Sequence, residues 1–319
     1  MPAGSNRLSI GLDDGRPHVM SLVRRWCSGD ESLDGGRPLP GRPFFPYSSG
    51  RAMLRLLIVG LLVLVLLKLA VSGLEPAMVF FPSRGEDDTP ARLGIRYEAL
   101  RLRTSDGVEI AAWQLEPESP RADIVYFHGN GGNLSLWLPV YATLHSFGYR
   151  VLAIDYRGYG LSGGTPSEEG LYRDAEAAVR HAVRTRGDAA RPLVYWGRSL
   201  GGPVAAAAAR VAAPHGLVLE STFPDKASVV RAMPLLRLLN VLARYRFSTV
   251  DALRGFDRPV LVVHAERDSV IPFRLGRELF ERLEAPKRFV TLVEGDHNDL
   301  FDARHMTYWR PVQAFIEAL

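Results

Sequence analysis

The sequence predicts an α/β domain with a mostly parallel, eight-stranded sheet, helices on both faces and a small helical lid insertion. Two observations favour this fold: strand-like runs alternate with longer helical patterns over residues 95–319, and the later of these runs are short and continuously apolar. Such runs are typical of parallel strands, because the crossover helices bury both faces of the sheet. The expected strands cover residues 95–103, 108–115, 122–127, 149–154, 192–196, 216–220, 259–264 and 287–293. The expected helices cover residues 133–147, 168–186, 200–213, 273–285 and 302–318.

Two segments depart from regular strand–helix alternation. The first two expected strands are joined by the turn sequence Ser105-Asp106-Gly107, so we expect an antiparallel pair at that edge of the sheet. Residues 223–247 interrupt the alternation with two prolines and several closely spaced leucines. This composition predicts the lid insertion.

The composition is that of a globular protein and excludes several classes. Hydrophobic residues make up 47% of the 319 residues and charged residues 23%. The net charge is +4, but the basic residues are scattered among acids without a long basic run, which argues against a nucleic-acid partner. The one cysteine, Cys27, excludes an intrachain disulfide and a cysteine-based metal site. We expect neither a metal nor another cofactor.

The N-terminal part of the chain divides into two segments. Residues 1–51 are rich in Gly, Pro, Ser and Arg, which predicts a disordered extension; alternatively, translation begins at Met53 and the extension is not made. Residues 52–74 are strongly apolar and, at about 1.5 Å per residue, long enough to cross a bilayer of roughly 30 Å. They predict a transmembrane anchor, or else a signal segment cleaved near the small residues 70–73. Residues 75–319 form the expected folded domain.

Flanking charges predict the orientation of this anchor. Arg42, Arg51 and Arg55 precede the span, whereas an acidic group that includes Glu75 and Glu86 follows it. Because positive residues favour the cytoplasmic side, we expect the folded domain on the extracytoplasmic side of the cytoplasmic membrane, or secreted if the segment is cleaved.

The pattern Gly-x-Ser-x-Gly occurs twice, as GRSLG around Ser199 and GLSGG around Ser162. A nucleophilic serine in this pattern sits on a sharp turn between a strand and a helix, with small neighbours because a Cβ there would clash. Ser199 follows the apolar strand LVYW and precedes a helical run of small residues. Ser162 lies in a loop rich in Gly and Pro. Ser199 is therefore the predicted nucleophile.

A serine hydroxyl becomes a good nucleophile when a histidine takes its proton and a carboxylate orients that histidine. In a strand–turn–helix site of this kind the partners follow in the order serine, acid, histidine, each on a loop after a strand. His297 directly follows the last expected strand and is the predicted base, whereas His264, which ends the strand before it, is interpreted as structural. Asp268 is the predicted acid, and Glu220 is the alternative.

The loop HGNGGN at residues 128–133 supplies the second half of an oxyanion hole. Its glycines let the main chain approach a ligand closely. The main-chain N–H groups of Asn130 and Leu200 are the predicted donors to the oxyanion. A phosphate site is the other use of a glycine-rich loop, but the sequence contains neither of the usual nucleotide-binding glycine patterns.

Taken together, these motifs resemble the α/β-hydrolases over about residues 76–319. The resemblance is strongest to membrane-anchored proteins with a serine-aminopeptidase-like hydrolase domain, which carry a short Phe-Phe-Pro-like segment after the span, here residues 79–82. The matching motifs, in order, are HGNGGN at 128–133, DYRGYGLSGG at 155–164, GRSLG at 197–201, ERDSVIP at 266–272 and HND at 297–299.

The resemblance implies the triad Ser199, Asp268 and His297 and the oxyanion donors Asn130 and Leu200. It also implies that the Asp155 loop is structural. One departure is an aspartate, residue 296, where the family more often has glycine; an extra carboxylate there is expected to raise the pKa of the neighbouring histidine.

We therefore expect a serine hydrolase that cleaves an acyl ester or thioester, with a small-molecule or lipid-like substrate. A serine peptidase of aminopeptidase type is the alternative within the same chemistry. A membrane-tethered binding module without catalysis is the alternative outside it, because a fold alone does not imply a function.

Overall fold

The computed structural model describes residues 49–232, 244–298 and 306–319. Most of the expected disordered extension and the centre of the expected lid lie outside these ranges. Of the insertion, the structure describes helix α5 (Lys226–Ala232) and the residues from 244 onward.

The main sheet has eight strands in the order β10-β9-β8-β7-β4-β6-β3-β2. β3 pairs antiparallel with both of its neighbours, and the other pairs are parallel, so β3 alone runs against the rest of this sheet. The prediction of a mostly parallel, eight-stranded sheet with an antiparallel edge is confirmed. The strand bounds are β2 Tyr97–Arg103, β3 Glu109–Leu115, β4 Ala122–Phe127, β6 Tyr149–Ile154, β7 Leu193–Arg198, β8 Gly216–Glu220, β9 Val260–Ala265 and β10 Lys287–Leu292.

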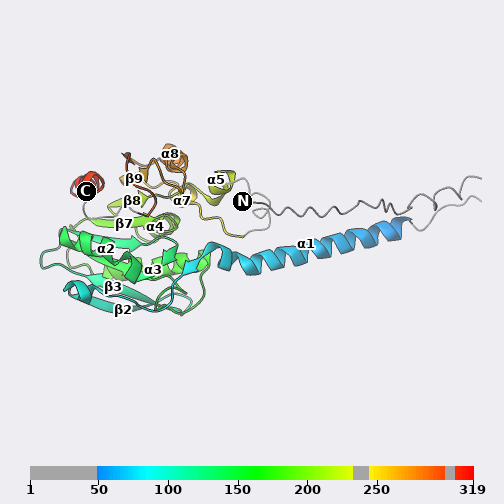
Figure 1. Cartoon of the computed structure of the whole chain (residues 1–319), viewed down its shortest axis with the longest axis horizontal. Helices are drawn as coiled ribbons and strands as arrows, with labels where there is room; N and C mark the ends of the chain where they lie inside the picture. Colours follow the sequence, from blue (N-terminus) through cyan, green and yellow to red (C-terminus); the bar gives the residue numbers. More distant parts are fainter. Residues whose placement is uncertain (1–48, 233–243, 299–305) are drawn as a thin grey trace, which may run out of the picture. The chain divides into compact units, whose positions relative to one another are not determined.

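Helices cover both faces of this sheet (Figure 1). Buried side chains of α2 and α9 form one hydrophobic cluster with the sheet, and those of α3, α4 and α8 belong to a second cluster. Successive residues of β4 alternate between the two: Ile124 and Tyr126 enter the first cluster, Val125 and Phe127 the second. This alternation is the two-residue period of a strand buried on both faces. The helix bounds are α2 Leu134–Ser146, α3 Glu168–Thr185, α4 Gly201–Ala209, α7 Thr249–Ala252, α8 Phe273–Arg282 and α9 Met306–Ile316.

A second, two-stranded sheet is absent from the sequence-based prediction. β1 (Phe81–Pro82) pairs in parallel with β5 (Gly131–Gly132). The pairing joins the Phe-Phe-Pro segment to the glycine-rich loop. Each of these strands is two residues long, and together they contain a proline and two glycines, so the sequence shows no strand periodicity there. Only the tertiary structure reveals the pair.

Helix α1 (Ser49–Val79) contains the apolar segment and continues five residues beyond its predicted end. It is long and apolar enough to cross a membrane, and residues 50–70 are exposed all round. Near the C-terminal end of α1, one face of the helix is no longer exposed: Ser72 and Glu75 are buried, and Val79 is half-buried. These positions are three and four residues apart, so they share one helix face.

Pro76 explains one contact of this face. Proline lacks the N–H that would bond to the carbonyl four residues earlier, which here belongs to Ser72. The Arg244 guanidinium donates to that carbonyl over 3.0 Å instead. The Glu75 carboxylate accepts the main-chain N–H groups of Arg244, at 2.8 Å, and Tyr245, at 3.1 Å. The last two turns of α1 are thus hydrogen-bonded to the C-terminal end of the insertion.

Candidate active site

Ser199 lies on a sharp turn between β7 and α4. Its φ is 52°, a left-handed conformation that a residue with a side chain adopts only at a steric cost. Gly197 and Gly201 flank it, and a Cβ on Gly201 would overlap the Phe127 carbonyl group at the end of β4. Glycine is required at this position because the start of α4 passes directly over the neighbouring strand. Ser199 is shielded, with 8% of its surface exposed.

The glycine-rich loop follows β4, which is the neighbour of β7 in the sheet. A Cβ built on Gly129 would lie 3.7 Å from the Ser199 Cβ, so this loop passes beside the serine. Leu200 is the N-cap residue of α4, and it is buried. The two predicted oxyanion donors, Asn130 and Leu200, therefore follow the ends of neighbouring strands. Asn130 comes directly after Gly129, and Leu200 comes directly after Ser199.

Asp268 and His297 are in direct contact. The Asp268 Oδ2 atom lies 2.8 Å from His297 Nδ1, and both residues are buried. Because a carboxylate oxygen only accepts, Nδ1 is the protonated nitrogen and Nε2 is left able to accept a proton. This is the tautomer that a general base for a serine requires. The sequence places the two residues 29 positions apart, on the loops after β9 and β10.

Four donors surround the Asp268 carboxylate. Oδ1 accepts the N–H groups of Val270 and Ile271, at 3.0 and 2.7 Å. His264 Nε2 lies 3.3 Å from Oδ2 and 2.8 Å from the Ile271 carbonyl oxygen; both are acceptors, so Nε2 carries a proton. Burial alone raises the pKa of Asp268, but the hydrogen bonds from His264 and His297 outweigh it and hold that pKa well below its usual range. His264, interpreted from sequence as structural, thus contacts the predicted acid.

Glu220, the alternative acid, has other partners. Its carboxylate accepts from the Trp196 indole N–H at 2.9 Å, the Tyr308 hydroxyl at 2.8 Å and the Arg198 guanidinium. Arg198 also donates to the main-chain carbonyl of His297. Burial lowers the pKa of Arg198, and the Glu220 carboxylate outweighs this effect and raises it. Arg198 therefore stays charged inside the domain, between the end of β7 and the loop that carries His297.

Sequence reasoning overlooked Arg198. The available signal was a charged residue at the end of an apolar strand, with an acid, Glu220, ending the next strand. A buried charge needs a partner of opposite sign, and the register pairs Arg198 with Glu220.

Replacing Glu220 with glutamine is expected to destabilise the domain by about 3–5 kcal/mol, because it leaves the buried Arg198 charge without its counter-ion. The variant is expected to keep most of its kcat, since Glu220 does not contact the His297 side chain through any hydrogen bond in the described residues. Urea unfolding followed by tryptophan fluorescence measures the stability. A Glu220→Gln protein that stays fully stable but loses catalysis would reassign Glu220 as the acid.

Asp296 holds two loops together. Its Oδ1 accepts the N–H groups of Ser269 at 2.7 Å and His297 at 2.6 Å, and its Oδ2 accepts the Ser269 hydroxyl at 2.7 Å. These bonds lower the pKa of Asp296. Asp296 therefore ties the histidine loop to the loop that carries Asp268, a role that its position in the sequence does not reveal.

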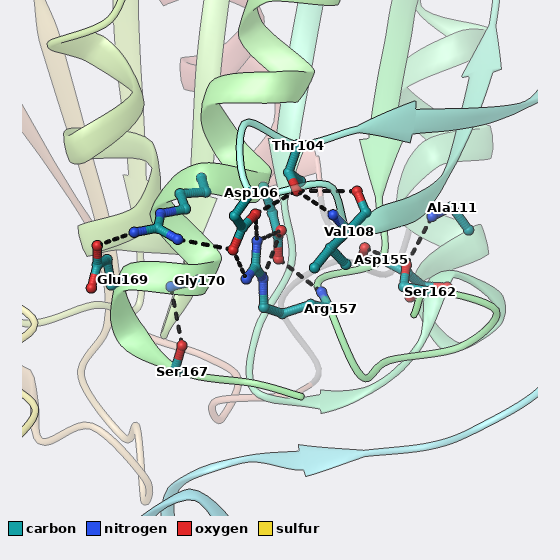
Figure 2. Close-up of polar contacts among 12 residues, drawn as sticks. Thr104, Asp106, Val108, Ala111, Asp155, Arg157, Ser162, Ser167, Glu169 and Gly170 are labelled. Atoms are coloured by element: carbon teal, nitrogen blue, oxygen red, sulfur yellow. Dashed lines mark hydrogen bonds and ion pairs between the residues drawn. The ribbon is translucent and has the colours of Figure 1, made fainter. Parts of the chain in front are cut away.

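Ser162, the serine of the second motif, has a different environment (Figure 2). Its hydroxyl donates to the Asp155 carbonyl at 2.7 Å and accepts the Ala111 N–H at 2.8 Å. Both bonds are buried and both partners are main-chain groups. The hydroxyl fastens the loop after β6 to strand β3.

An ion-pair network holds the same loop from its other side, where Arg157 lies between two carboxylates, as Figure 2 shows for Asp106. Arg157 donates to Asp106 at 2.8 and 3.0 Å and to Asp174 at 2.9 Å, and the Arg157 guanidinium holds the pKa of Asp106 well below its usual range. Asp155 accepts the N–H of Leu134 at 2.8 Å, and burial raises its pKa to about 7. These contacts are those of a structural loop.

A central strand that ends in a sharp serine turn, with an acid and a histidine on later loops of a mostly parallel sheet, defines the α/β-hydrolase class. Comparison with known proteins agrees. Residues 118–252 match the family model described as serine aminopeptidase, S33. The α/β hydrolase domain-containing protein WAV2 of Arabidopsis thaliana is 34% identical, with 72% of this chain and 81% of the relative covered.

Two further likenesses extend this comparison. The uncharacterized membrane protein YNL320W of Saccharomyces cerevisiae is 31% identical, with 73% of this chain and 84% of the relative covered. The solved structure of the Pyrococcus furiosus esterase Pf2001 shares the fold at a TM-score of 0.63 and 19% identity, with 75% of this chain and 97% of that chain covered. The chain belongs to the α/β-hydrolase family, and the matches support a hydrolase function.

Proposed function

We propose that this protein is a membrane-anchored serine hydrolase that cleaves acyl esters or thioesters through the triad Ser199, Asp268 and His297. Ser199 Oγ attacks the acyl carbonyl carbon as His297 Nε2 takes the hydroxyl proton. The main-chain N–H groups of Asn130 and Leu200 hold the resulting oxyanion. His297 then gives its proton to the leaving alcohol or thiol, which departs and leaves the acyl group on Ser199. Water, deprotonated by His297, releases the acid and restores the serine.

The observation that carries this proposal is the contact between Asp268 Oδ2 and His297 Nδ1. It accounts for the histidine tautomer, and the depressed pKa of Asp268 keeps the carboxylate ionised over the range in which a histidine base operates. The left-handed turn at Ser199 gives independent support, since strain of this kind is concentrated at functional positions.

Labelling with a fluorophosphonate probe tests the proposal. The purified full-length protein is expected to label once per chain, and Ser199→Ala to remain unlabelled. Folded wild-type protein that does not label would favour the binding-module alternative. A substrate panel of p-nitrophenyl esters, acyl thioesters, lysophospholipids and aminoacyl amides then distinguishes the acyl classes. Esters or thioesters are expected to be the better substrates.

A serine peptidase of aminopeptidase type is the second candidate, favoured by the description of the family model that matches residues 118–252. The same nucleophile and base would act on an amide. Solved structures with this fold include esterases from Pyrococcus furiosus and Exiguobacterium antarcticum, which favours hydrolysis of an ester over hydrolysis of an amide. Faster turnover of aminoacyl amides than of esters in the panel would reverse this order.

The anchoring half of the proposal rests on α1. Its residues 50–70 are exposed and residues 56–67 carry no polar side chain, as a helix in contact with lipid requires. Residues 70–73, which resemble a signal cleavage site, lie inside this helix, and Ser72 is buried. A retained anchor is therefore favoured over a cleaved signal. We place the hydrolase domain on the extracytoplasmic side, because the basic residues precede the span.

A reporter fused after residue 80 tests this orientation. Alkaline phosphatase, which is active outside the cytoplasm, is expected to be active in the fusion, whereas a cytoplasm-dependent reporter at the same position is expected to be silent. The reverse pair of activities would place the domain in the cytoplasm and contradict the orientation.

A further inference from the structure

The segment that leaves α1 is built into the glycine-rich loop. Asn130 is the centre of this contact: its side-chain NH₂ donates to the Val79 carbonyl, and its Oδ1 accepts the Phe81 N–H at 3.4 Å. Two residues further on, the Ser83 N–H donates to the Gly132 carbonyl at 3.0 Å, which continues the β1–β5 pairing. Residues 79–83 therefore run alongside residues 130–132 as a short strand.

The segment itself is firmly held. Phe80 is 3% exposed, and its ring packs edge-on against Tyr245 and Phe247, with ring centroids 5.5 and 6.2 Å away. Beyond the strand, the Gly160 N–H donates to the Ser83 carbonyl at 2.8 Å. Residues 79–83 thus have fixed partners on both sides and can serve as a support for a less rigid neighbour.

The glycine-rich loop is such a neighbour. Three of its residues, Gly129, Gly131 and Gly132, lack a side chain to pack, and Gly132 has a φ of 81°. Glycine gives the main chain the most conformational freedom, so contacts from outside must fix the loop. A displacement of about 1 Å in a catalytic group costs on the order of 100-fold in rate. The Tyr159 hydroxyl donates to the Asn130 carbonyl at 2.9 Å, and the contacts of the Asn130 side chain are the other bonds that fix the position of the Asn130 N–H.

We propose that residues 79–83 are a positioning element of the oxyanion hole, which holds the Asn130 main-chain N–H toward the substrate carbonyl bound beside Ser199, through the Asn130 side chain and the Ser83–Gly132 bond. The inference rests on the proposed serine-hydrolase function. The exit of the apolar helix would then support the position of a catalytic group as well as connect the domain to the proposed anchor.

Two variants of the full-length protein test the proposal. Asn130→Ala removes the side-chain bonds to Val79, Phe81 and the Tyr159 hydroxyl and keeps the main-chain N–H and its carbonyl bond to Tyr159. Ser83→Pro removes the donor to Gly132, while Ser83→Ala keeps it and serves as the matched control, since the Ser83 side chain is exposed. Hydrolysis of a p-nitrophenyl ester is measured in detergent, and rates are divided by the concentration of active sites, titrated with the fluorophosphonate.

We expect kcat per active site to fall about 10- to 100-fold in Asn130→Ala, with a smaller fall in Ser83→Pro and none in Ser83→Ala. KM is expected to stay within about twofold, because the oxyanion forms only in the transition state. A purely architectural role would lower the active fraction and leave kcat per site unchanged, and that result would overturn the proposal, as would a rise in KM alone. Wild-type protein that does not label would overturn the serine-hydrolase function as well, which separates the two failures.

Discussion

Replacing Ser199 with alanine is expected to lower kcat for a p-nitrophenyl ester by about 10⁴- to 10⁶-fold. The variant loses the nucleophile, and the oxyanion donors alone stabilise little of the transition state for direct attack by water. Its stability is expected to change little, since alanine meets the same left-handed strain at φ 52° as serine does. Hydrolysis rates and urea unfolding of the same preparations measure both quantities. Fluorophosphonate labelling of the alanine variant would contradict the assignment.

Ser162→Ala is the matched control, because Ser162 sits in the same Gly-x-Ser-x-Gly pattern. The substitution leaves a buried N–H, that of Ala111, and a buried carbonyl, that of Asp155, each short of a partner. We expect a loss of about 1–3 kcal/mol in the free energy of unfolding, with labelling and kcat retained. Substitution of Ser199 should therefore affect the reaction, whereas substitution of Ser162 should affect stability.

Asp268→Asn is expected to lower kcat by about 10⁴-fold, with little change in substrate binding. The asparagine amide can donate to His297 Nδ1, which favours the tautomer with the proton on Nε2 and removes the base. Steady-state kinetics measure the fall. If Asp268→Asn keeps its kcat while Glu220→Gln loses it, the acid is Glu220.

The same variant has a pH signature in stability. Because the folded-state pKa of Asp268 lies below its usual value of about 3.9, the ionised carboxylate stabilises the fold above that pH. This contribution is lost as the pH falls through the folded-state pKa. The difference in unfolding free energy between wild type and Asp268→Asn is therefore expected to be largest near neutral pH and to shrink below about pH 4. A difference that is constant with pH would mean that the carboxylate is not the stabilising form.

Most of the fold could be predicted from local sequence patterns. The strand-like runs marked all eight strands of the main sheet to within about two residues. The runs in the middle of the sheet were the most apolar, because strands buried on both faces leave few polar positions. The serine turn was equally predictable, because its steric demands require glycines at a fixed spacing. Contacts between distant polar residues were not. Nothing near Asp296 in the sequence shows that it bonds Ser269, and nothing near Asn130 shows that its side chain reaches Val79. Such bonds depend on how the loops meet after the sheet has formed.

The bonds of Ser72 and Glu75 to residues 244 and 245 have a mechanical consequence. A domain on a flexible tether samples many heights and tilts above a bilayer, whereas here the final turns of the proposed anchor are bonded to the domain. A transmembrane helix adjusts its tilt to the thickness of the surrounding hydrocarbon. The proposed anchor would therefore pass a change in its tilt to residues 244 and 245 through these bonds. Under the proposed function, hydrolysis of a membrane-borne substrate would then depend on bilayer thickness, whereas hydrolysis of a soluble ester would not.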